Sequence, residues 1–113
     1  MKVLELPLPP LANRYWRLGR GHLYRSHDAE VYRQTVAVLG RDYPRHDGDV
    51  VVTVKVYRKR HAGDLDNYLK VLLDALQGVA FTNDRQVQTI LASLEPVDPV
   101  RPRVEVIVSD APC

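Results

Sequence analysis

The stretch VVVTVKVYRKRHAGDLDNYLKVLLDALQG, residues 50–78, joins a strand pattern to a helix pattern through a short acidic segment. Residues 50–60 are rich in β-branched side chains, and apolar and polar positions alternate from Val52 onward, which predicts a strand. Residues 66–77 carry leucines at the i, i+3, i+4, i+7 spacing of a helix with one apolar face. Gly78 is a typical residue to end that helix.

Further elements flank this unit on both sides. They are a strand at 2–6, a helix at 28–40 that Ser26 or Asp28 can cap, and strands at 86–96 and 103–109, with loops at 13–26 and 41–49. The order β-α-β-α-β-β indicates an α+β fold in which a mixed β-sheet carries two main helices on one face.

The size and composition indicate one globular domain. A chain of 113 residues suits a single domain over 1–113, and 45% hydrophobic with 27% charged residues is ordinary for a soluble protein. No apolar run approaches the roughly 20 residues of a membrane span. The start MKVLELPLPPL is a poor signal peptide, and the single cysteine, Cys113, suits a reducing compartment. We therefore expect a cytoplasmic protein.

Basic residues gather in two parts of the sequence although the net charge is only +2. Arginine binds phosphates through two parallel hydrogen bonds, so these clusters are candidates for DNA binding. A solvated surface explains the charge equally well. Three aromatic residues, Tyr15, Trp16 and Phe81, are candidates to stack on unpaired bases or to pack in the core. The candidate DNA-binding residues are Arg14, Arg17, Arg20, Arg25, Arg58, Lys59 and Arg60.

The segment GDLDNYLK, residues 63–70, admits two interpretations. Asp66 suits the N-cap of the helix or its neighbour, and Lys70 can form surface ion pairs with Asp66 and Asp74. Alternatively, Asp64 and Asp66 point to one side while Leu65 points to the core. Two such carboxylates repel by roughly 4 kcal/mol at an effective dielectric constant near 20, unless a proton or a cation lies between them.

A divalent cation that prefers oxygen ligands, such as Mg²⁺, fits the second interpretation. Asp84 is a candidate third ligand, because the seven residues from Gly78 to Asp84 span about 23 Å when extended and the helix is about 16 Å long. The chain can then double back to the helix start, or a partner subunit can complete the site. Lys70 would neutralise charge on a phosphate. Calcium-loop and zinc-ligand spacings are not matched.

Two segments together resemble a known family. GDLDNYLKVLLDALQGVAFTNDRQV, together with LPLPPLANRYWR and AEVYRQTV nearer the N-terminus, resembles the RusA family of Holliday junction resolvases. The resemblance implies a homodimeric, magnesium-dependent endonuclease, bacterial or phage-encoded, that resolves four-way DNA by paired symmetric nicks in recombination and repair. It implies that Asp64, Asp66 and Asp84 are catalytic and bind Mg²⁺, with Mn²⁺ as a substitute, and that Lys70 is catalytic.

One position departs from the family pattern. The acidic pair of the family reads Asn83-Asp84 here, so one carboxylate is replaced by an amide. We expect Asp84 to be the essential member. Asp74 matches a family position, and we expect it to be structural and to pair with Lys70.

Two other functions remain open from the sequence. One is a structure-specific nuclease that acts on other branched DNA, and the second is a non-catalytic DNA-binding protein whose aspartates are caps and ion pairs.

A dimer suits a four-way junction, because the near two-fold symmetry of the junction matches a two-fold pair of active sites. An enzyme of small molecules is disfavoured, since no glycine-rich phosphate loop is present.

Overall fold

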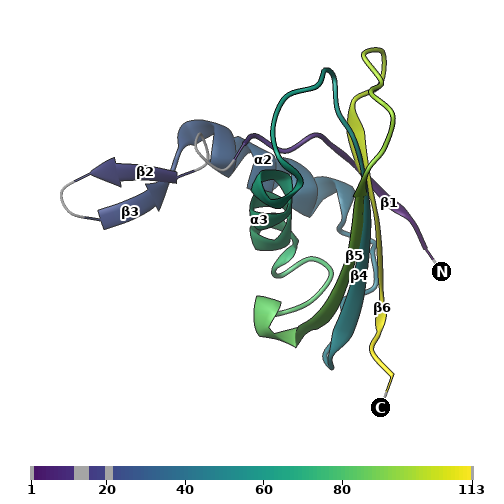
Figure 1. Ribbon diagram of the computed structural model, residues 1–113. Helices are drawn as coiled ribbons and strands as arrows, with labels where there is room; N and C mark the ends of the chain where they lie inside the picture. The colour runs from purple at the N-terminus through teal and green to yellow at the C-terminus, as the bar shows by residue number, and fades with distance from the viewer. Residues whose placement is uncertain (1, 12–15, 20–21, 113) are drawn as a thin grey trace.

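The computed structural model describes residues 2–11, 16–19 and 22–112, with the backbone alone for 16–19 and 22–25. These described residues form two helices, a one-turn 3₁₀ helix and strands in one sheet and one hairpin (Figure 1). In chain order these are β1 (Leu4–Pro7), β2 (Trp16–Gly19), β3 (His22–Arg25), α2 (His27–Leu39), β4 (Val50–Tyr57), α3 (Leu65–Leu76), η1 (Asp84–Gln86), β5 (Val87–Leu94) and β6 (Arg103–Asp110).

The main sheet has the strand order β1-β6-β4-β5. β6 pairs antiparallel with both β1 and β4, whereas β5 pairs parallel with β4, from Val50 beside Val87 to Val56 beside Leu94. The sheet is therefore mixed, as predicted. β5 forms one edge of the sheet.

The parallel pairing requires a crossover between β4 and β5. α3 provides it, running back along the sheet so that β5 begins at the same end as β4 (Figure 1). The buried residues Tyr68, Val71, Leu72, Ala75 and Leu76 form the face of α3 that packs against the core.

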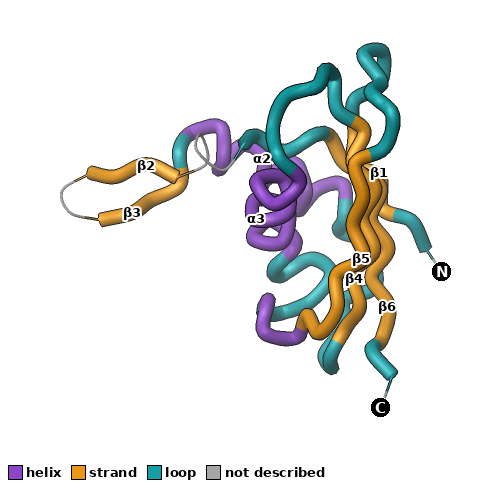
Figure 2. The backbone as a smooth tube through the Cα atoms, in the orientation of Figure 1, coloured by secondary structure: helices purple, strands orange, loops and turns teal. Residues whose placement is uncertain are grey.

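Both helices cover the same face of the sheet (Figure 2), which confirms the predicted layer arrangement. Alternate residues of β4 point into this layer and are fully buried, as the burial pattern of the strand shows. Phe81, in the loop after α3, is also fully buried, and it is the largest such side chain among those that the structure describes. Of the two roles predicted for Phe81, packing in the core is therefore confirmed, and stacking on unpaired bases is wrong.

The predicted elements agree with the structure to within a few residues, with one omission. The loop expected at 13–26 contains the hairpin β2–β3, in which Trp16 lies opposite Arg25 and Arg17 opposite Tyr24. Its two strands have four residues each and pair only with each other, so they carry little of the alternation that identifies a strand from sequence. Figure 1 shows the hairpin extending away from the sheet.

Within the described part of the chain, no helix has both the length and the apolar character that crossing a membrane requires.

Replacing Phe81 by alanine tests the core. We expect Phe81→Ala to lower the free energy of unfolding by about 3–5 kcal/mol, because the buried ring leaves a cavity. Val100→Ala is the control, since Val100 is 89% exposed and its truncation should change little. Urea unfolding followed by circular dichroism measures both, and equal midpoints for the two variants would contradict the assignment of Phe81 to the core.

Candidate active site at the start of helix α3

The first two candidate carboxylates lie where the chain enters α3. Asp64 is the N-cap residue, with extended backbone angles, yet its side chain makes no capping hydrogen bond. Asp66 lies in the first turn, and both aspartates are exposed. Leu65 between them packs against the core, as predicted. The helix thus begins without using either carboxylate as a cap, which leaves both available for a ligand.

The loop before Asp64 is fixed by two side chains. Arg58 donates a hydrogen bond from Nη1 to the Gly63 carbonyl at 3.1 Å, and the Tyr68 hydroxyl donates to the Ala62 carbonyl at 2.8 Å. Burial raises the pKa of Tyr68, an effect that the neighbouring positive charges of Arg58 and Arg60 oppose. The hydroxyl therefore stays protonated and keeps donating at neutral pH.

Gly63 completes this loop with a φ of +86°, in the left-handed region that favours glycine. A Cβ atom at this position would lie 2.6 Å from Leu11 Cδ2 and 2.8 Å from the Tyr68 hydroxyl oxygen. The close packing and the backbone angle together make glycine the residue that fits directly before Asp64.

Lys70 lies on the exposed side of α3, one turn after Asp66. Among the described side chains, it forms no ion pair with Asp66 or Asp74. Asp74 is instead paired with Arg33 of α2, whose Nη1 lies 3.0 Å from Asp74 Oδ2 and also donates to the Asp74 carbonyl at 2.9 Å. The expected pair of Lys70 and Asp74 is wrong, because α2 packs beside α3 and brings a guanidinium group to Asp74.

Asp84 lies at the opposite end of α3. Its backbone N–H donates to Gln77 Oε1 at 3.3 Å, and Gln77 is the C-cap residue of the helix. Of the two alternatives that the sequence left open, the one in which the chain doubles back to the helix start is wrong, because β5 begins at the end of the sheet where β4 begins. Within residues 2–11 and 26–112, no three His, Cys, Asp or Glu side chains are close enough to hold one metal ion.

The turn that carries Asp84 is built by Asn83 and Gln86. Asn83 Oδ1 accepts from the Arg85 N–H at 2.9 Å, and Gln86 Oε1 accepts from the Asn83 N–H at 2.9 Å, which forms a capping box around η1. Gln86 also donates from Nε2 to the carbonyls of His46 and Gly48. The role of Gln86 was not predicted from the sequence, although the spacing Asn-x-x-Gln is the signal of this motif.

The candidate DNA-binding residues fall into three groups. Lys59 and Arg60 are exposed in the loop that leads to Asp64, whereas Arg58 is half-buried and uses Nη1 on Gly63. Arg17 and Arg25 lie in the β2–β3 hairpin, and so does Trp16. Only the backbone of these residues is described. Arg14, Tyr15, Arg20 and Cys113 lie outside the described residues.

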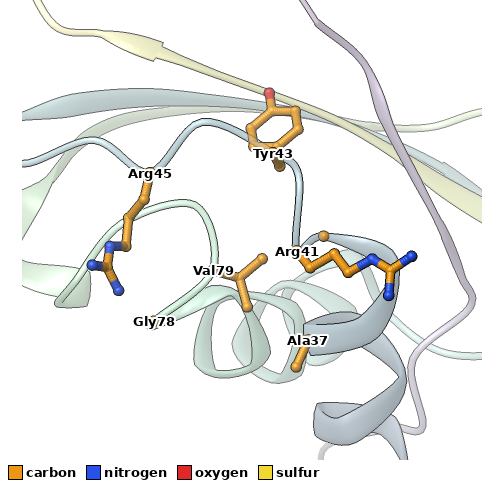
Figure 3. A pocket seen from close by; sticks show the side chains of 7 residues that line it. Ala37, Arg41, Tyr43, Arg45, Gly78 and Val79 are labelled. Atoms are coloured by element: carbon orange, nitrogen blue, oxygen red, sulfur yellow. The ribbon is translucent and has the colours of Figure 1, made fainter.

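A hollow of about 400 Å³ lies elsewhere, between the C-terminal ends of the two helices. Figure 3 shows Arg41 and Arg45 at its rim on either side of Val79, with their guanidinium groups pointing away from each other. The two charges do not converge on a common point, so the hollow is not arranged to bind one anion.

Comparison with known proteins assigns the chain to a class. A model of the family described as endodeoxyribonuclease RusA matches residues 7–109. Crossover junction endodeoxyribonuclease RusA of Escherichia coli K12 is 34% identical over 90 residues, which is 74% of each chain. The corresponding proteins of Enterobacteria phage 82 and phage HK97 are 34% and 36% identical, covering 74% and 70% of this chain and 74% and 69% of their own lengths.

These matches define an endodeoxyribonuclease, a hydrolase that cuts phosphodiester bonds within DNA. The chain belongs to the RusA family, which confirms the resemblance found in the sequence. The matched range contains all four candidate catalytic residues.

Replacing Gly63 by alanine tests the loop before Asp64. We expect Gly63→Ala to lower the free energy of unfolding by about 1–3 kcal/mol, because the left-handed backbone and the contacts with Leu11 and Tyr68 both oppose a Cβ atom. Gly48→Ala is the matched control, since a Cβ atom there meets nothing within 4 Å. Thermal unfolding of both variants measures the difference, and a Gly63→Ala protein as stable as Gly48→Ala would refute the constraint.

Proposed function

We propose that this protein resolves Holliday junctions by paired, symmetric, magnesium-dependent nicks in recombination and repair. The observation that carries this proposal is the pair of exposed carboxylates at the start of α3, neither of which caps the helix, in a chain of the RusA family. Its relatives are named crossover junction endodeoxyribonucleases. The protein would act in the cytoplasm, where bacterial or phage DNA is found.

The carboxylates suit a hard divalent cation in their chemistry. Asp64 and Asp66 offer carboxylate oxygens, the ligands that Mg²⁺ prefers, and Mn²⁺ accepts the same ligands. If Mg²⁺ were bound there, it would orient the scissile phosphate and lower the pKa of the attacking water. The rigid loop held by Arg58 and Tyr68 fixes where the two carboxylates stand, so they need not reorganise when the phosphate binds.

Lys70 and the basic loop would act on the DNA itself. The Lys70 ammonium, one turn along the exposed face of α3, would offset the negative charge that grows on the phosphate as water bonds to phosphorus and a P–O bond breaks. Lys59 and Arg60 would contact neighbouring phosphates. The β2–β3 hairpin, with Arg17 and Arg25 in its strands, extends away from the sheet (Figure 1) and would add further contacts to the DNA.

The third carboxylate would come from a second copy of the chain. The edge strand β5 exposes Ile90, Leu91 and Leu94 by 39%, 58% and 39%, and an exposed apolar edge is a natural site for pairing with another strand. Two-fold symmetry makes such a pair antiparallel, so that the start of one β5 lies beside the end of the other.

This pairing would bring the separated carboxylates together. Asp84 opens η1, the turn that directly precedes β5, whereas the end of β5 lies beside the end of β4, close to the loop that leads to Asp64. α3 and η1 lie on the same face of the sheet (Figure 1), and a two-fold axis perpendicular to the sheet preserves that face. Asp84 of the partner subunit would thus approach Asp64 and Asp66, giving one shared site at each end of the interface.

The junction assay tests the activity directly. We expect the wild-type protein to nick a synthetic four-way junction only when Mg²⁺ or Mn²⁺ is present. Asp66→Asn should bind the junction normally and lose most nicking, because an amide oxygen carries no charge to hold the metal. Equal nicking of four-way, three-way and linear DNA would favour a nuclease of other branched DNA. Metal-independent binding without any product would favour a non-catalytic DNA-binding protein.

Mixing two inactive variants tests the shared site. Asp66→Asn and Asp84→Asn proteins, unfolded together and refolded, form some mixed dimers. If each site takes Asp84 from the partner subunit, a mixed dimer has one site with both defects and one intact site. We expect single-strand nicks to reappear in the mixture, although each variant alone is inactive. With a site built within one subunit, every subunit is defective and the mixture stays inactive, so that result would exclude the shared site.

A further inference from the structure

In the turn at residues 82–86, most backbone N–H groups donate to acceptors within the turn, and one donates to a side chain outside it. Gln86 Oε1 accepts from Thr82 and Asn83, both at 2.9 Å. Asn83 accepts from Arg85 through Oδ1 and from Gln86 through its backbone carbonyl. These four bonds are made within the turn itself. The N–H of Asp84 differs, because its partner is a side chain on another element.

Gln77 supplies that partner at the end of α3. Its Oε1 accepts from the Asp84 N–H at 3.3 Å, and its Nε2 donates to Asp74 Oδ1 at 3.4 Å. A carboxylate only accepts hydrogen bonds, so Asp74 fixes which end of the Gln77 amide faces Asp84. Arg33 in turn holds Asp74 through its other oxygen, Oδ2, at 3.0 Å.

The chain of contacts runs from α2 to the candidate metal ligand. Arg33, Asp74 and Gln77 are all partly buried, which strengthens the bonds between them relative to exposed pairs. Asp84 itself is exposed, and its carboxylate therefore depends on the placement of its backbone. A ligand carboxylate must be held within about half an ångström of its working position, and supporting hydrogen bonds provide this.

We propose that Gln77 is a positioning residue that, with Asp74 and Arg33, holds Asp84 in place to bind the metal. The role of Asp84 in this statement rests on the proposed function. The hydrogen bond from the Asp84 N–H to Gln77 is independent of it. Two kinds of measurement are therefore needed, one on the bond and one on the metal.

Amide hydrogen exchange measures the bond. We expect the Asp84 amide of Gln77→Ala to exchange several-fold faster than in the wild-type protein, while the Arg85 amide, bonded within the turn, changes little. Gln34→Ala is the matched control, because Gln34 is an exposed glutamine on α2. Unchanged exchange at Asp84 in Gln77→Ala would overturn the proposal, whether or not the protein nicks DNA.

The metal requirement measures the consequence. We expect the Mg²⁺ concentration for half-maximal junction nicking to rise roughly 10- to 100-fold in Gln77→Ala, the usual effect of losing a group that supports a ligand. Junction affinity without metal and the melting temperature should match those of Gln34→Ala. An unchanged Mg²⁺ requirement alongside faster Asp84 exchange would also overturn the positioning role.

Exchanging the amide and the carboxylate between residues 74 and 77 tests whether the hydrogen bond between them can be restored in the reverse direction. Gln77→Glu keeps the acceptor for Asp84 but places a second carboxylate against Asp74, so we expect it to behave like Gln77→Ala. In Asp74→Asn with Gln77→Glu, the asparagine amide donates to the glutamate, which still accepts from Asp84. In this double variant we expect slow exchange of the Asp84 amide and the low Mg²⁺ requirement to return. If neither returns, the proposed positioning of Asp84 by Asp74 and Gln77 is wrong. If the wild-type protein nicks no junction, the proposed function fails. Exchange of the Asp84 amide in these variants still tests whether Gln77 and Asp74 hold Asp84 in place.

Discussion

The parallel pairing of β5 with β4 is the constraint on which the arrangement of the molecule depends. It obliges the chain to run back along the sheet as α3 before β5 can begin. The buried face of that helix covers the sheet and supplies much of the core. The same route separates the two acidic segments, because one precedes α3 and the other follows it. The candidate carboxylates therefore lie at the two ends of one helix, with Asp64 and Asp66 at its start and Asp84 near its end.

The two acidic segments are held by different physical means. The segment before α3 is a loop fixed by an arginine, a buried tyrosine hydroxyl and a left-handed glycine. The segment after α3 is a single 3₁₀ turn whose amides are bonded to the side chains of Asn83, Gln86 and Gln77 and to one carbonyl within the turn. In both segments the hydrogen bonds are made by neighbouring residues, and the aspartates themselves remain exposed. Such an arrangement suits carboxylates whose partner is a ligand.

The sequence predicted the elements well because each depends on local patterns. The alternation in β4 and the leucine spacing in α3 are visible without knowledge of the rest of the chain, and so is the polar segment with Gly63 that separates them. The hairpin was missed because its strands are short and pair only with each other. The sequence left the position of Asp84 relative to the start of α3 open for another reason. Whether β5 pairs parallel or antiparallel with β4 is a property of the whole sheet, and strand patterning does not determine it.

Asn83 shows how this architecture tolerates change. Its work in the turn is to accept a hydrogen bond from the Arg85 N–H, and an aspartate accepts that bond equally well. The resemblance to the family implies an acid at this position, and an exchange between acid and amide would alter the charge beside Asp84 while leaving the hydrogen bond to Arg85 intact. The charge next to the candidate ligand can therefore change by one unit at residue 83 without loss of the bond that shapes the turn.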